Sequence, residues 1–200
     1  MIRGAPTWPP LPPALVAPGK AVRSSTATFG GDLQLLLIRH ADAGDPDPVR
    51  YRDDRERPLT PLGEREHATV AAALARLDLG ITHVLTSPLV RARQTAEITA
   101  RALGVDSVII VQALGDRFHQ DDLLAELGAL PSTASVACVG HEPTISGFAA
   151  TLLDGAGHMR IAFAKGAVMA LECQGSPAPA GARLLFFWSP RELDRLLGAR

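Results

Sequence analysis

The sequence lacks the features that mark membrane-spanning, nucleic-acid-binding and zinc-binding proteins. No apolar run approaches the ~18 residues that a membrane helix needs. The formal net charge is −1 at pH 7, so neither nucleic acid nor a membrane surface is an expected partner. The two cysteines, Cys138 and Cys173, lie in apolar runs without CxxC or Cys/His spacing. We therefore expect no metal site, and buried, reduced thiols in a cytoplasmic protein.

The first 32 residues differ in composition from the rest of the chain. Six of the sixteen prolines lie between Pro6 and Pro18, and no acidic residue precedes Asp32. Proline this dense excludes a helix or a central strand, and it interrupts the continuous apolar segment of a secretory signal. We expect residues 1–32 to form a flexible, Pro-rich N-terminal tail, and residues 33–200 to form one domain with a substantial core.

The most informative segment is an apolar run that stops at an arginine and a histidine. Residues 35–38 are apolar without alternation, which is typical of a strand buried on both faces of a parallel sheet. Arg39 and His40 follow directly, and the Asp-, Gly- and Pro-rich residues 41–48 cannot continue the strand. Open α/β sheets bind ligands at the carboxyl ends of their strands, so this pair should border a ligand crevice.

Strand and helix signals alternate along the remaining chain. Strands are expected at 81–86, 108–111, 135–139, 167–173 and 183–188. Thr60-Pro61 predicts the start of a helix that ends at Gly80, and Ser87-Pro88 predicts another start. Further helices are expected at about 119–127, 143–153 and 190–197, the last opened by a capping box at residues 189–192. This order predicts an α/β fold with a mostly parallel sheet and helices on both faces.

Three of the predicted strands lead into residues that suit an anion. Arg39 and His40 follow the first strand, Arg91 follows the second, and His141 follows the fourth. The carboxyl ends of parallel strands share one edge, so these side chains could converge beside helix N-termini. Arginine matches phosphate oxygens and keeps its charge, while nearby cations keep a histidine neutral and able to attack. The arrangement predicts phosphoryl transfer through His40.

Four motifs, in this order, resemble the histidine phosphatase superfamily, which is phosphoglycerate mutase-like. They are residues 36–41 (Leu-Leu-Ile-Arg-His-Ala), 57–63 (Arg-Pro-Leu-Thr-Pro-Leu-Gly), 86–96 (Thr-Ser-Pro-Leu-Val-Arg-Ala-Arg-Gln-Thr-Ala) and 139–143 (Val-Gly-His-Glu-Pro). The short chain and the Arg-Pro-Leu-Thr segment look like the SixA-type phosphohistidine phosphatase branch. The resemblance implies a three-layer α/β/α sandwich, phosphorylation of His40, phosphate binding by Arg39, Arg91 and His141, and no metal or organic cofactor.

Two positions depart from the pattern of the superfamily. Ala41 stands where glycine usually follows Arg-His, and the SixA-like branch tolerates alanine there. No carboxylate is unambiguously the general acid that larger relatives use to protonate the leaving oxygen. Glu142, beside His141, and Asp116 are the two candidates.

The missing acid favours a phosphohistidine substrate. An alkoxide is a poor leaving group, and help from an acid is worth ~10²–10⁴-fold, whereas the imidazole of a phosphoramidate needs much less help. The favoured function is therefore dephosphorylation of phosphohistidine in a protein partner. One alternative is a phosphatase for small phosphomonoesters, with Glu142 or Asp116 as general acid. Another is a non-catalytic phosphate-binding module. A mutase is least expected, because it needs an enclosed site and an acid.

Overall fold

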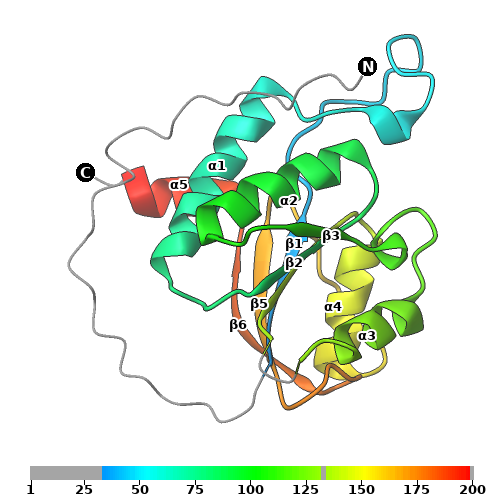
Figure 1. Cartoon of the computed structure of the whole chain (residues 1–200), viewed down its shortest axis with the longest axis vertical. Coiled ribbons are helices and arrows are strands. Elements are labelled where there is room, and N and C mark those ends of the chain that lie inside the picture. Colours follow the sequence, from blue (N-terminus) through cyan, green and yellow to red (C-terminus); the bar gives the residue numbers. More distant parts are fainter. Residues whose placement is uncertain (1–32, 132–133, 199–200) are drawn as a thin grey trace. The chain divides into compact units, whose positions relative to one another are not determined.

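A computed structural model describes residues 33–131 and 134–198, so the expected N-terminal tail lies outside the described residues. The described chain forms one six-stranded sheet with helices on both faces (Figure 1). The strands are β1 (Leu33–Arg39), β2 (His83–Thr86), β3 (Val108–Ile110), β4 (Val136–Gly140), β5 (Val168–Cys173) and β6 (Ala182–Trp188). The helices are α1 (Pro61–Arg76), α2 (Val90–Leu103), α3 (Gln120–Gly128), α4 (Thr144–Asp154) and α5 (Pro190–Gly198), with short 3-10 turns η2 (Asp54–Glu56) and η3 (Gln112–Leu114).

The sheet has the strand order β3-β2-β4-β1-β5-β6. β1 pairs parallel with β4, and β2 pairs parallel with both β4 and β3, whereas β5 is antiparallel to β1 and to β6. The register places Arg39 opposite Gly140, and Thr86 opposite Val139. The three strand ends expected to carry the site therefore lie level at one edge. The predicted mostly parallel, three-layer α/β fold is confirmed.

The unbroken apolar run of β1 is explained by burial on both faces of the sheet. Leu35 and Leu37 pack in a cluster with side chains of α3 and α4. Leu36 and Ile38 point the other way and pack with α1 and α2, where Leu193 of α5 joins them. Figure 1 shows the same division, with α1, α2 and α5 on one side of the sheet and α3 and α4 on the other. Because successive strand residues alternate between faces, both sets must be apolar.

The predicted helix starts are correct at α1 and α5 and wrong at α2. Thr60 caps α1, where its Oγ1 accepts from the Gly63 N–H at 2.9 Å. At α5, the Ser189 N–H donates to Glu192 Oε2 at 2.7 Å, as a capping box requires. α2 begins at Val90 instead of beside Ser87, and its N-terminus has no side-chain cap. The Ser87 hydroxyl is used elsewhere, as described below.

Other boundaries differ from expectation by a few residues. α1 ends at Arg76 with Leu77 as its C-cap, before Gly80, which has a positive φ of 61° in the connection to β2. The helix thus ends one turn earlier than the glycine suggested, and the glycine serves the following turn.

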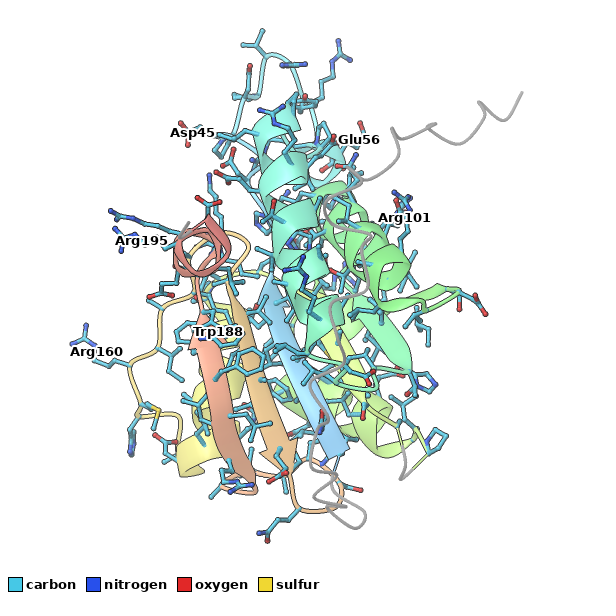
Figure 2. All side chains as sticks on the ribbon, turned by 90° about the vertical axis from the view of Figure 1, so that its left-hand side faces the viewer. Asp45, Glu56, Arg101, Arg160, Trp188 and Arg195 are labelled. Atoms are coloured by element: carbon cyan, nitrogen blue, oxygen red, sulfur yellow. The ribbon has the colours of Figure 1, made fainter. Side chains whose placement is uncertain are left out.

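β6 forms one edge of the sheet, and its Trp188 ring stacks on Phe186 with centroids 4.1 Å apart (Figure 2).

The apolar interior holds both cysteines. Cys138 and Cys173 are both buried, as predicted, and burial raises the pKa of the Cys138 thiol to about 12. In the part of the chain that the structure describes, every helix is too short or too polar to cross a bilayer.

Candidate active site

His40 lies directly after β1, at the edge where the parallel strands end. Its N–H donates to the Gly140 carbonyl at 3.0 Å, and its own carbonyl accepts from the Gly166 N–H at 3.0 Å. The backbone is therefore held by the end of β4 and by the segment that precedes β5. The side chain is buried, with 7% of the residue exposed, so the imidazole has little freedom to reorient.

One hydrogen bond determines the tautomer of His40. Its Nδ1 lies 2.7 Å from the Ala41 carbonyl oxygen. A carbonyl can only accept, so Nδ1 carries the hydrogen and Nε2 carries the lone pair. The Ala41 N–H in turn donates to Thr95 Oγ1 at 3.1 Å, which fixes this peptide against α2. The ring thus carries its lone pair on Nε2.

The surroundings of His40 keep its imidazole neutral at physiological pH. Burial lowers the pKa of His40 from 6.5 to about 4, and the positive charges of Arg91, Arg39 and Arg57 act in the same direction. The hydrogen bond to Ala41 opposes the shift but does not cancel it. A neutral imidazole is the form that can attack phosphorus.

His141 faces His40, and Ser87 orients it. The two imidazole centroids are 5.0 Å apart, and His141 Nε2 lies 2.8 Å from Ser87 Oγ. Ser87 Oγ also accepts from the Leu89 N–H at 3.2 Å, and its hydroxyl hydrogen can donate to His141 Nε2. In that tautomer, His141 Nδ1 carries the hydrogen, and this buried atom has no partner among the described residues. Burial, followed by the charges of His40, Arg91 and Arg39, lowers the pKa of His141 to about 3.

The two predicted arginines bring positive charge to the same place. Arg39 Nη1 donates to the Phe163 carbonyl at 2.6 Å, and Arg91 Nη1 donates to the Asp54 carbonyl at 2.9 Å. The Nε atoms of both guanidiniums are buried without a partner among the described residues. Unpaired buried donors are uncommon in native proteins. An oxyanion bound among these groups would supply the acceptors.

Two charged residues of the site were missed by sequence reasoning, Arg57 and Asp54. Arg57 is buried, and its Nη1 donates to the carbonyls of Ala43 and Gly44, both at 2.8 Å. Its Nε donates to Asp54 Oδ1 at 2.7 Å, and Arg91 lies 3.2 Å from Asp54 Oδ2. The hydrogen bond from Arg57, with the charges of both arginines, holds the pKa of Asp54 below its usual range.

The loop that carries these residues connects β1 to α1. Figure 2 shows Asp45 and Glu56 of this loop projecting away from the sheet, and both are exposed. Arg57 turns inward instead and fastens the loop to the segment after His40. The i,i+3 spacing of Asp54 and Arg57 was the available signal, but several charges occur together here and the sequence does not distinguish them.

The Ser-Pro-Leu-x-Arg-Ala-x-Gln-Thr motif holds the site together from one face of α2. Gln94 Oε1 accepts from the Leu59 N–H at 2.7 Å, which fixes the segment before α1. Thr95 accepts from Ala41, beside His40. Both follow Arg91 by three or four residues, which places all three on one side of the helix. The motif therefore aligns the β1 loop, the α1 loop and a guanidinium at once.

The structure accommodates alanine at the position that follows His40. Ala41 is 2% exposed, and its side chain packs in a small apolar cluster with Leu59 and Ile98. The methyl group thus fills space that the surrounding loops provide.

The two candidate acids occupy different surroundings. Glu142 accepts two hydrogen bonds, from the Phe163 N–H to Oε1 and from the Ser146 hydroxyl to Oε2, each at 2.6 Å. Asp116 is exposed, and its negative charge acts on Arg91, whose pKa it raises in opposition to burial. Among the described residues, no three His, Cys, Asp or Glu side chains are grouped as a metal ion would require.

This geometry defines a class of protein: an α/β phosphatase with an imidazole in a positively charged cup. The sequence profile of the histidine phosphatase superfamily (branch 1) matches residues 35–122. An uncharacterised protein of Picosynechococcus sp. is 38% identical over 126 residues, which cover 62% of this chain and 74% of the relative. A probable phosphoglycerate mutase of Escherichia coli, GpmB, is 40% identical over 76 residues, but the match spans only 34% of the mutase.

Solved structures give the same family over the whole fold. The protein histidine phosphatase SixA, solved with tungstate, superposes with a TM-score of 0.70 at 27% identity and covers 80% of this chain and 99% of its own. A protein assigned as SixA from Nakamurella multipartitia has a TM-score of 0.64 at 34% identity, with 80% and 98% coverage. The chain belongs to the histidine phosphatase superfamily. It is accordingly a histidine-dependent phosphatase. The alternative of a non-catalytic phosphate-binding module is therefore not supported.

Proposed function

We propose that residues 33–200 form a phosphatase domain that removes the phosphoryl group from phosphohistidine in a protein partner. His40 Nε2 attacks phosphorus, and the N–P bond of the substrate breaks as the new N–P bond forms. The free ring nitrogen of the substrate takes a proton from water, so imidazole leaves as a neutral molecule. Water then hydrolyses phospho-His40 and returns the free enzyme with inorganic phosphate.

Arg39, Arg91 and His141 hold the three phosphoryl oxygens in this proposal. Negative charge spreads over these oxygens in the transition state, so positioning and charge stabilisation dominate catalysis. The unpaired buried Nε atoms of both arginines and Nδ1 of His141 support this assignment. The neutral state of His40 supports its role as the nucleophile, because its pKa is lowered to about 4 by burial and the nearby cations.

The proposed substrate class rests on the carboxylates near His40 and the two arginines, because those carboxylates are not placed to donate a proton. Glu142 uses both oxygens to hold Ser146 and Phe163. Asp54 contacts Arg91, but its pKa is lowered, so it carries no proton to donate at neutral pH. A site of this kind suits a leaving group that needs little protonation. The imidazole of phosphohistidine meets that need better than an alkoxide.

A cleft beside the site supports a polypeptide substrate. It lies between α1 and α5, has a volume of about 560 Å³, and includes Arg65, Lys165 and Arg191 in its lining. Lys165 Nζ lies 2.6 Å from Asp42 Oδ1, so the cleft adjoins the segment that follows His40. Residues flanking a phosphohistidine could occupy it. The two similar SixA structures, described as a protein histidine phosphatase and a phosphohistidine phosphatase, also agree with this substrate.

A second candidate function is hydrolysis of a small phosphomonoester with Asp116 as general acid. The electrostatic effect of Asp116 on Arg91 places this carboxylate within range of the site. Asp116 is exposed, whereas a carboxylic acid that donates a proton at neutral pH is typically buried or lies beside a second negative charge. This candidate therefore ranks second.

The test is an assay of the purified full chain against a phosphohistidine protein and a panel of sugar phosphates. We expect release of phosphate from the phosphohistidine protein at a rate well above that for any sugar phosphate. His40→Ala should abolish it, and Asp116→Asn should leave it within a few-fold. Turnover that survives His40→Ala would contradict the mechanism. Rapid sugar phosphate hydrolysis that Asp116→Asn removes would establish the second candidate instead.

A further inference from the structure

Two short hydrogen bonds connect Glu142 to Arg39 through one peptide segment. Glu142 Oε1 accepts from the Phe163 N–H at 2.6 Å, and the Phe163 carbonyl accepts from Arg39 Nη1 at 2.6 Å. Both bonds use the backbone of the same residue. A displacement of Phe163 therefore changes the acceptor on which the Arg39 guanidinium rests.

The segment around Phe163 is anchored at both ends, by Asp154 at residues 156–159 and by the Gly166 N–H at the carbonyls of Arg39 and His40, and Phe163 lies between these anchors. The Phe163 ring is 2% exposed and contacts the Phe187 ring, with centroids 4.7 Å apart. No regular helix or strand includes residues 155–167, so its backbone groups need partners from outside the segment. The Glu142 carboxylate supplies one of them, and Ser146 holds its second oxygen. The carboxylate is thus fixed between helix α4 and this segment.

We infer that Glu142 is a positioning residue that keeps Arg39 aligned with the phosphate, and that it is not the general acid. The inference rests on the proposed role of Arg39 in binding phosphate. Glu142 lies directly after His141 in the sequence. One short segment therefore provides both the His141 imidazole, which hydrogen-bonds the phosphate in the proposed mechanism, and the carboxylate that positions the Arg39 guanidinium. The role requires a hydrogen-bond acceptor at Oε1, whereas an acid requires a removable proton.

An amide at position 142 separates these two roles. Glutamine keeps an oxygen that can accept from the Phe163 N–H. Its NH₂ group can donate to Ser146 Oγ, whose hydroxyl hydrogen can turn to the Pro143 carbonyl, 2.9 Å away. The network therefore survives Glu142→Gln, while the ability to deliver a proton is lost. Glu142→Ala removes both.

The experiment compares Glu142→Gln and Glu142→Ala in the full chain with the control Glu97→Ala, which removes an exposed carboxylate of α2. Steady-state kinetics with phenyl phosphate give kcat and KM, because phenolate leaves poorly enough for the loss of a general acid to be seen. Inhibition by tungstate reports anion binding without chemistry. We expect Glu142→Gln and Glu97→Ala to stay within about threefold of wild type. We expect Glu142→Ala to weaken tungstate binding and raise KM by about tenfold or more, because a misplaced cation binds the oxyanion poorly.

Two outcomes would overturn the inference. If Glu142→Gln loses turnover while tungstate binds normally, Glu142 supplies a proton. If Glu142→Ala binds tungstate as wild type does, Arg39 does not depend on it. Should Glu142→Ala fail to fold, the Glu142→Gln result alone still decides between acceptor and acid. His40→Ala with intact tungstate binding but unchanged turnover would refute the proposed nucleophile, and this result is separate from both outcomes above.

Discussion

Replacement of Gly63 by alanine tests how closely helix α1 supports the segment that follows His40. A Cβ at Gly63 would lie 2.1 Å from the Asp42 carbonyl oxygen, where contacts under 3.0 Å essentially never occur. The Asp42 carbonyl also accepts from the Thr60 N–H at 2.9 Å, so helix and loop are already fastened together. To relieve the clash, one of them must move by about 0.9 Å or more.

The magnitude follows from two opposing effects. Overpacking in a tight contact costs about 1–3 kcal/mol, and alanine in place of glycine in a helix gains up to about 1 kcal/mol. We expect Gly63→Ala to lower the free energy of unfolding by about 1–2 kcal/mol. Asp42 is only two residues from His40, and the Ala41 carbonyl between them fixes the imidazole. A shift near 1 Å there should reduce kcat/KM by about ten- to a hundredfold.

Gly147 offers a matched control. It lies in the first turns of α4, is exposed, and has nothing within 4 Å of the position of an added Cβ. Gly147→Ala should raise the free energy of unfolding by about 0.5–1 kcal/mol and leave activity unchanged. Urea unfolding measures both variants, and their midpoints should differ by about 1 M if the slope is about 2 kcal/mol/M. Equal shifts of the two midpoints, or wild-type kcat/KM in Gly63→Ala, would refute the reasoning.

Three further predictions concern pH and Arg57. In the proposed mechanism His40 attacks only when neutral, and burial lowers its pKa to about 4, so kcat/KM should keep its value from pH 7 to about 5 and fall near pH 4. A fall centred at pH 6.5 would contradict this. The unfolded chain takes up protons at His40 from about pH 6.5 downward while the folded protein resists until about pH 4, so the free energy of unfolding, followed by urea titration, should decrease over that range. Arg57→Lys keeps the positive charge but loses the guanidinium that donates to Ala43, Gly44 and Asp54. We therefore expect kcat/KM to fall about tenfold. The control Arg55→Lys, which alters only the exposed Arg55–Asp53 ion pair, should match wild type.

Hydrophobic pattern and local signals were sufficient to predict the fold. The unbroken run at residues 35–38 indicated burial on both sides, and the two faces of β1 do pack against different helix pairs. Thr60 and Ser189 marked helix starts correctly because a cap depends on neighbours three residues away. Parallel strands align their carboxyl ends, so the sequence also predicted that Arg39, His40, Arg91 and His141 would gather at one edge.

The partners of the polar side chains were decided only by the tertiary structure. Ser87 had the sequence of a helix cap, yet its hydroxyl orients His141, 54 residues away in the chain. Glu142 was a candidate acid, yet its carboxylate holds Phe163. A hydroxyl or carboxylate can bond to any donor or acceptor that packing brings near, and buried groups must find such a partner. The sequence by itself determined which residues line the edge of the sheet, because periodicity and caps are local. Which of them binds which was settled by long-range packing, which no short stretch of sequence encodes.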